Sequence, residues 1–111
     1  MLNDLDDVSF TLNANAREKG FWDADTPENR TIFYLKQIAM IHSECSEVLE
    51  AIRKEHGDDI VVEELADIII RTLDLYAGMA TDGYTKLSLQ KAMQKKMDKN
   101  ILRPRMHGVL A

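Results

Sequence analysis

Apolar side chains recur every three or four residues along most of this chain, which is the spacing expected of α-helices that bury one face. The clearest example is a seam whose spacing alternates between three and four, formed by Leu35, Ile38, His42, Cys45, Leu49 and Ile52. Such a seam is typical of a helix packed along its length against another helix. No stretch alternates with the period of two that marks a β-strand, and the two prolines, Pro27 and Pro104, leave the middle of the chain free. The sequence therefore predicts an all-α protein.

Capping and breaking residues divide the chain into four expected helices, over about residues 4–19, 26–56, 58–78 and 86–100. Thr26 is a favourable N-cap and Pro27 a favoured first-turn residue, so the second helix is expected to begin there. Gly57 can adopt the left-handed conformation that ends a helix, and Asp58 or Asp59 can cap the next one. The sequence thus predicts a helical bundle of about four helices.

The expected third helix is apolar almost all round. Ile68, Ile69 and Ile70 follow one another, and the polar stripe is formed by Glu64, Asp67, Arg71 and Asp74. A helix of this kind belongs at the centre of a bundle. A chain of 111 residues has too few helices to surround it on every side. We therefore expect self-association to complete the bundle, as a homodimer or a dimer of dimers.

Two pairs of acidic residues lie within these helices. Glu44 and Glu47 are three residues apart in the expected second helix, and Glu64 and Asp67 are three apart in the third. Residues at this spacing are neighbours on one helix face, so two facing helices would bring four carboxylates together. Four such charges on an apolar wall repel one another unless a cation neutralises them. The sequence predicts a site for a hard divalent ion, Mg²⁺ with Mn²⁺ as the alternative.

Other interpretations of these residues compete with a magnesium site. Arg71 is one helical turn from Asp67 and can pair with it, and Asp74 can pair likewise, which would give a salt-bridge network without chemistry. A di-iron bundle requires Glu-x-x-His, and no histidine of this chain has a glutamate three residues before it. A single thiol, Cys45, and the lack of paired histidines disfavour zinc.

Composition and charge narrow the classes of protein. With 111 residues, 45% of them hydrophobic and 30% charged, the chain is expected to form one soluble globular domain over residues 1–111. A net charge of −5, with basic residues gathered only near the C-terminus, argues against a nucleic-acid polymer as partner. A lone cysteine, no readable signal peptide and no apolar run of membrane-spanning length favour a cytoplasmic protein without a membrane partner.

Four stretches of the chain together resemble a known family. They are REKGFW at 17–22, SECSEVLEAIRK at 43–54, EELADIIIRTLDL at 63–75 and KKMDKNILRPRMHG at 95–108. Their order and spacing resemble the MazG-like nucleotide pyrophosphohydrolases of the all-α NTP pyrophosphatase superfamily, which typically show E-E-x-x-E, then E-x-x-D, then K-M-x-x-N-R followed by Arg-Pro. Ser43 stands at the first glutamate of that pattern, and Ile101 stands where the arginine commonly follows the asparagine.

The resemblance implies an enzyme that hydrolyses nucleoside triphosphates, typically deoxynucleotides, to the monophosphate and pyrophosphate, in a role such as nucleotide-pool housecleaning. The resemblance also implies that the metal ligands are Glu44, Glu47, Glu64 and Asp67. Either Glu44 or Glu47 would accept the proton of the attacking water, and the sequence does not choose between them. A Mg²⁺-bridged triphosphate would also explain how an acidic protein binds a polyanion.

Candidates for substrate contact lie in two further segments. Lys96 and Asn100 match the family's triphosphate-contacting lysine and asparagine, with Arg103 and Arg105 as further candidates. Basic residues in a last helical turn are also favoured by the helix dipole alone. Trp22 either stacks on the base or fastens a loop to the core. Its neighbour Phe21 is expected in the core.

Two other functions remain open at this point. A noncatalytic helical dimer that binds a nucleotide or a protein partner would be stabilised by its ligand but would show no turnover. An enzyme for a diphosphate-containing molecule outside the standard nucleotides would share the same acidic residues. Turnover assays separate these functions from the predicted one.

Overall fold

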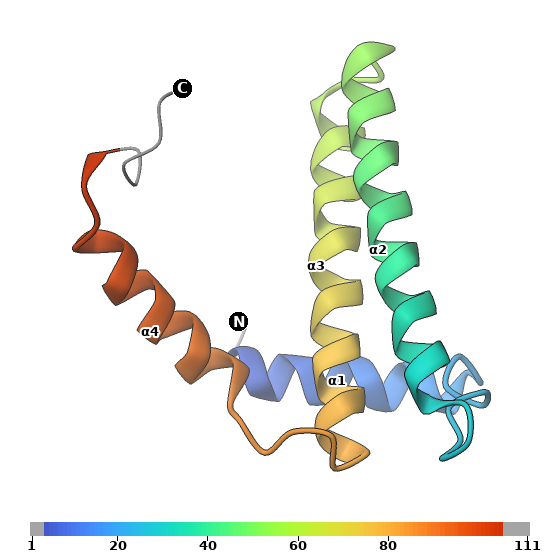
Figure 1. The fold of residues 1–111 in the computed structure, drawn as a ribbon. Helices are drawn as coiled ribbons and strands as arrows, with labels where there is room; N and C mark the ends of the chain where they lie inside the picture. The colour runs from blue at the N-terminus through green and yellow to red at the C-terminus, as the bar shows by residue number, and fades with distance from the viewer. Residues whose placement is uncertain (1–3, 106–111) are drawn as a thin grey trace.

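The computed structural model describes residues 4–105 and contains four α-helices within them, with no strand in that range: α1 (Leu5–Glu18), α2 (Arg30–Arg53), α3 (Asp58–Thr81) and α4 (Leu89–Ile101). The all-α prediction is confirmed. The helices α2 and α3 form a long antiparallel hairpin, α1 crosses near the open end of that hairpin, and α4 extends away from it (Figure 1). Residues 106–108, the end of the last stretch used for the family resemblance, lie outside the described residues.

The predicted start of the second helix is wrong. Residues 26–29 form a turn in which the Asn29 N–H donates to the carbonyl oxygen of Thr26 at 3.0 Å, and α2 begins only at Arg30. Arg30 pairs with Asp25 at 3.1 Å and with Asp82 at 3.2 Å. Because Asp82 follows the last turn of α3, tertiary ion pairs hold the first turn of α2 in place, and Thr26 does not cap it.

Other helix ends also differ from the sequence prediction. The cap of α3 is Gly57, so Asp58 and Asp59 lie in its first turn, where they complement the helix dipole. The helix continues to Thr81, beyond the predicted end at residue 78. The fourth helix begins at Leu89 and not near residue 86, because the Ser88 hydroxyl caps it by accepting from the Lys91 N–H at 3.1 Å.

The small core lies where α1 crosses the hairpin. Its buried members are Trp22, Phe33, Tyr34 and Leu75, with Ala16, Ile41 and Met79 packed around them. The rings of Trp22 and Phe33 are 4.8 Å apart between centroids and tilted, which is a favourable aromatic arrangement. The expectation that Phe21 is a core residue is wrong, since 70% of Phe21 is exposed while only 4% of Trp22 is. The indole fills the space above Gly78, and the preceding side chain is left outside.

The close contact between Trp22 and Gly78 makes Gly78→Ala a strongly destabilising change. A Cβ atom at position 78 would lie 1.9 Å from Cη2 of Trp22, so helix or ring must shift. We expect the free energy of unfolding to fall by about 1–3 kcal/mol, and the melting temperature by at least about 4 °C. In a Trp22→Phe background, Gly78→Ala should lower the free energy of unfolding by less. The reason is that the atoms with which the new Cβ would clash belong to the six-membered ring of the indole. An unchanged melting temperature for Gly78→Ala would contradict this packing.

The apolar seam predicted on the second helix is open to solvent in the single chain. Exposed fractions along it are 61% for Leu35, 40% for Ile38, 57% for Leu49 and 58% for Ile52. His42 and Cys45 are exposed as well. The face of α2 that packs on α3 is therefore a different one. An apolar stripe of this length on a monomer surface is typical of a protein interaction site.

The helix α4 is attached to the rest of the chain mainly through the start of α1. The Leu5 N–H donates to Gln90 Oε1 at 2.6 Å, the Gln90 N–H donates to Asp6 Oδ1 at 3.0 Å, and the Ser88 hydroxyl donates to Asp6 Oδ2. No residue of α4 is buried. Within residues 4–105, no helix combines the length and apolar character needed to cross a membrane.

Candidate functional site

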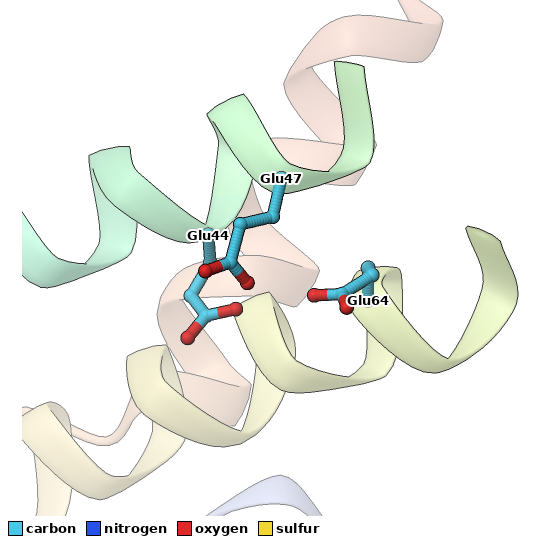
Figure 2. Close-up of side chains that lie close together, drawn as sticks. All are labelled: Glu44, Glu47 and Glu64. Carbon is cyan, nitrogen blue, oxygen red and sulfur yellow. The ribbon is translucent and has the colours of Figure 1, made fainter. Parts of the chain in front are cut away.

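Three of the four predicted metal ligands converge in the gap between α2 and α3. One carboxylate oxygen from each of Glu44, Glu47 and Glu64 lies within 4.8 Å of the others. Figure 2 shows the two glutamates of α2 and the glutamate of α3 directing their carboxylates toward a common space. The i, i+3 spacing aligns Glu44 and Glu47 on one face of α2, and the antiparallel pairing of the helices brings Glu64 opposite them.

Asp67 lies one helical turn further along α3 than Glu64. It lines a pocket beside the cluster together with Glu44, and it is not a member of the three-carboxylate group. The structure thus places the fourth predicted ligand next to the other three, at the boundary between the carboxylate cluster and the pocket.

Two buried carboxylate oxygens of this cluster lack hydrogen-bond partners. The side chain of Glu44 is only 13% exposed and its Oε1 accepts from Arg71 Nε at 2.9 Å. Its other oxygen, Oε2, is buried without a hydrogen-bond partner, and so is Oε2 of Glu64. A buried acceptor without a partner is destabilising, and more so when it is charged. A divalent cation would satisfy both oxygens, so the donor set fits a hard metal ion.

A pocket of about 500 Å³ extends from the carboxylates toward the loop after α1. Its polar lining comes from Asn15, Lys19, Lys36, Gln37, Glu44, Asp67, Arg71 and Asp74, and its apolar lining from Leu12, Ala16, Phe21, Trp22, Met40 and Ile70. This volume lies in the range of small-molecule sites, and the lining combines apolar walls with polar groups that can orient a ligand.

The structure shows Trp22 fastening the loop to the core at the far end of this pocket. Its indole N–H donates to both carboxylate oxygens of Asp74 at 3.1 Å, and Asn13 Nδ2 donates to Asp74 Oδ1 at 2.9 Å. The guanidinium of Arg17 lies 4.8 Å from the ring centroid. Asp74 is therefore occupied in positioning the indole, and Trp22 contributes a fixed wall of the pocket.

The candidates for phosphate contact lie on a different part of the molecule. Lys96 and Asn100 belong to α4, and Arg103 and Arg105 follow it. None of these residues lines the pocket beside the carboxylates, and α4 diverges from the α2–α3 hairpin (Figure 1). Asn100 is half-buried, and its Oδ1 atom is buried without a partner. A single chain does not bring these side chains to the carboxylate cluster.

Comparison with known protein families identifies the chain. The sequence profile of the MazG nucleotide pyrophosphohydrolase domain matches residues 34–107, well over half of the chain. The chain belongs to this family. Comparisons with curated proteins and with solved structures found no match. The matched region includes the carboxylate cluster, Arg71 and all of α4.

Membership of the MazG family assigns a class of chemistry to the carboxylates. MazG proteins are nucleotide pyrophosphohydrolases and are typically metal-dependent. The cluster of Glu44, Glu47 and Glu64 could hold a metal ion, and the adjoining pocket offers room for part of a nucleotide. The candidate active site of this MazG protein is therefore the gap between α2 and α3.

The close approach of the three glutamates changes the acidity of the most exposed one. Hydrogen bonding with Glu64 and with Glu44, together with the charges of both, raises the pKa of the Glu47 carboxyl above the ordinary value for a glutamate. Protonation of Glu47 lowers the same repulsion that a bound metal ion would lower. Metal binding should therefore displace this proton.

This raised pKa predicts how pH acts on the metal-free protein. Between the ordinary pKa of glutamate and the raised value, the folded state binds more protons than the unfolded state, so stability falls as pH rises through that interval. In a chelator-containing buffer, the melting temperature of wild type should fall relative to that of Glu47→Gln as the pH rises. The affinity of wild type for Mg²⁺ should increase over the same pH interval. An identical pH dependence in both proteins would contradict the raised pKa of Glu47.

Lys36 and the ion pair of Arg71 with Glu44 were not predicted from the sequence. Lys36, Met40 and Glu44 follow one another at four-residue spacing along α2, so the helical period alone could have placed Lys36 on the face of the carboxylates. For Arg71, the alternative interpretation offered Asp67 on the same helix as a partner, and the ion pair found joins it to Glu44 on the facing helix. No local pattern signals a contact between residues that are 27 positions apart.

Proposed function

We propose that this protein is a Mg²⁺-dependent nucleoside triphosphate pyrophosphohydrolase that converts an NTP or dNTP to the monophosphate and pyrophosphate, in nucleotide-pool housecleaning, with residues 1–111 acting as one domain. The observation that carries the proposal is the convergence of Glu44, Glu47 and Glu64 beside a pocket of about 500 Å³ in a member of the MazG family. The lone cysteine, Cys45, is free and fits a reducing compartment, which we take to be the cytoplasm.

Four carboxylates would hold the metal: those of Glu44, Glu47 and Glu64, and that of Asp67 at the pocket boundary. Carboxylate oxygen favours Mg²⁺, with Mn²⁺ as the alternative. When bound, such an ion offsets the negative charge of the phosphates and lowers the pKa of the attacking water. Oxygen atoms already buried without partners, on Glu44 and Glu64, support this donor set.

Glu47 is our choice for the general base. The Oε1 atom of Glu44 is engaged by Arg71, and its side chain is largely buried. Glu47 is exposed and forms no ion pair within residues 4–105. A carboxylate that binds a metal ion through one oxygen can accept the proton of water through its other oxygen. Glu44 then serves as a ligand in a fixed orientation.

The pocket between the carboxylates and the loop would receive the base and sugar. Trp22 forms one wall, and Lys19, Lys36 and Gln37 supply donors along the others. A bound nucleoside would displace water from the apolar walls of this pocket, and this displacement would favour binding. The base preference depends on these pocket side chains and is measured by the assay below.

A second copy of the chain is proposed to complete the site. The exposed seam of α2 supplies a self-complementary apolar surface for a homodimer, or a dimer of dimers. Basic side chains are gathered on and after α4, namely Lys91, Lys95, Lys96, Lys99, Arg103 and Arg105, in a chain whose net charge is −5. Charge complementarity favours docking of this segment at the acidic hairpin of the partner. Lys96 and Asn100, with Arg103 and Arg105 as further contacts, would then reach the triphosphate.

Light scattering of the purified chain tests the assembly. We expect a mass of two or four chains, and Leu49→Glu in the exposed seam should lower that mass because it places a charge where apolar side chains meet. Leu87→Glu is a matched control, since Leu87 is 75% exposed in the loop before α4. A wild-type mass of one chain would overturn the proposed dimer.

The enzyme assay is direct. Purified protein is incubated with each common NTP and dNTP in the presence of Mg²⁺, and pyrophosphate and monophosphate are quantified. We expect the two products in equal amounts from at least one substrate, and no reaction in excess EDTA. Failure to release pyrophosphate from any of them would overturn the proposal. Ligand-induced stabilisation without turnover would instead favour the noncatalytic nucleotide-binding dimer.

A further inference from the structure

We propose that Arg71 contacts the α-phosphate of the bound nucleotide and stabilises the negative charge that develops there, in addition to holding Glu44. The inference rests on the proposed function, because it assumes a nucleotide in the pocket. Its starting point is the position of Arg71 between two parts of the site.

Along α3 the polar residues follow the order Glu64, Asp67, Arg71 and Asp74, from the carboxylate cluster toward the core end of the pocket. At 1.5 Å per residue, Arg71 lies about 10 Å along the helix from Glu64 and about 5 Å from Asp74. Arg71 lines the pocket, and it also contacts Glu44 of the cluster. It therefore stands at the junction of the cluster and the pocket.

The chemistry of a nucleotide determines what lies at this junction. The α-phosphate joins the nucleoside to the β- and γ-phosphates. With the nucleoside in the pocket and the outer phosphates at the carboxylates, the α-phosphate falls between them, beside Arg71. This phosphorus atom is also where the reaction occurs, since the products are a monophosphate and pyrophosphate.

Arg71 has donors left for such a contact. Its guanidinium carries five N–H groups, and the contact to Glu44 uses Nε alone. The side chain is 37% exposed, so the terminal nitrogens can be approached from the pocket. Guanidinium groups match the geometry of phosphate oxygens and keep their charge at any physiological pH. The ion pair with Glu44 joins α3 to the facing helix α2 at 2.9 Å, and it fixes the position of the guanidinium before substrate arrives.

The step that Arg71 assists is balanced as follows. The oxygen of water forms a bond to the α-phosphorus, and its proton passes to a carboxylate oxygen of Glu47. The bond from the α-phosphorus to the oxygen bridging to the β-phosphate breaks, and the electron pair leaves with pyrophosphate. Arg71 stays protonated throughout and donates hydrogen bonds to the α-phosphate oxygens, where preorganised donors are most effective.

The test compares Arg71→Gln with Arg53→Gln. Arg53 also pairs with a glutamate at 2.9 Å, but it is 69% exposed and does not line the pocket, so it controls for the loss of charge and of an ion pair. For Arg71→Gln we expect kcat to fall by about 10²–10³-fold at saturating Mg²⁺. Arg53→Gln should match wild type. Arg71→Lys keeps the charge and should recover part of the loss.

A binding measurement separates phosphate contact from positioning of Glu44. Calorimetry with Mg²⁺ present compares the 5′-monophosphate with the nucleoside that carries the base of the best substrate. Wild type should bind the monophosphate more tightly than the nucleoside. In Arg71→Gln the ratio of the two dissociation constants should be at least about tenfold smaller than in wild type. The dissociation constant for Mn²⁺, followed by electron paramagnetic resonance, should stay within about threefold of wild type if the contact is to phosphate.

Each outcome decides the matter. An unchanged preference for the monophosphate, with Mn²⁺ binding strongly weakened, would show that Arg71 only positions Glu44 and would overturn the proposal. Unchanged kcat would overturn it as well. If Arg71→Gln does not fold, Arg71→Lys undergoes the same comparison, and equality with wild type in both measurements is the contradicting result. No turnover by wild type would overturn the proposed function, and this inference with it.

Discussion

Replacing Glu47 with glutamine should lower kcat for pyrophosphate release by about 10²–10⁴-fold. The amide cannot accept the proton of the attacking water, and it is a poorer ligand for a hard cation. At the same time the change removes a charge from a cluster in which three carboxylates lie within 4.8 Å of one another. The metal-free variant should therefore melt no lower than metal-free wild type, since repulsion with Glu44 and Glu64 is relieved.

The neighbouring acid Glu63 supplies the control for this variant. It precedes Glu64 on α3 and is exposed, so Glu63→Gln makes the same chemical change outside the cluster and should leave kcat near wild type. Asp67→Asn should behave like Glu47→Gln, with lost catalysis and retained folding. A large drop in melting temperature for either variant would instead mean that the carboxylates form a structural network.

Two inactive variants should restore activity when they are combined in one oligomer. If the carboxylates come from one copy and Lys96 from another, Glu47→Gln and Lys96→Gln damage opposite halves of each site. A mixed dimer then contains one site with both changes and one site with neither. Per purified mixed dimer, about half of wild-type activity should return, because one of its two sites is intact. Arginine or lysine contacts to phosphate are strong enough that Lys96→Gln alone should be severely impaired.

Mixing is achieved by co-expression with two affinity tags, followed by tandem purification. The control pairs Glu47→Gln with Asp67→Asn, which lie in the same half of the site and should not complement each other. Recovery in the first mixture and none in the second is the expected result. If neither mixture recovers, Lys96 acts within its own chain or not at all, and the proposed completion of the site by a partner is wrong.

The position of α4 in the single chain is the reason to expect that a partner completes the site. Its few contacts with the rest of the chain are made through Leu5, Asp6, Ser88 and Gln90, at the helix start. Further along the helix, Met93 and Met97 line a hollow with Leu5 and are each still 49% exposed. An amphipathic helix gains most of its stability from packing of its apolar face. The assembly would therefore stabilise α4 and complete the phosphate contacts in the same step.

The class of fold and the identity of the acidic residues could be predicted from the amino-acid pattern alone. Helical period and turn residues act over a few positions, so four helices and the i, i+3 acid pairs could be predicted from local patterns. Local patterns did not predict the helix ends that depend on contacts between residues distant in the sequence. Arg30 begins α2 because it pairs with Asp25 and Asp82, and the position predicted from Thr26 was wrong for that reason.

How the predicted residues are combined follows from the packing of the helices and not from any local pattern. The pairing of α2 with α3 sets which carboxylates meet, so Glu44, Glu47 and Glu64 form the cluster and Asp67 lies at its edge. The close approach of Gly78 to the indole buries Trp22 and leaves its neighbour in the chain exposed. These outcomes depend on the angle and register at which helices cross, which are set by side-chain packing between segments far apart in the chain. The residue pattern along a single helix does not contain information about that packing.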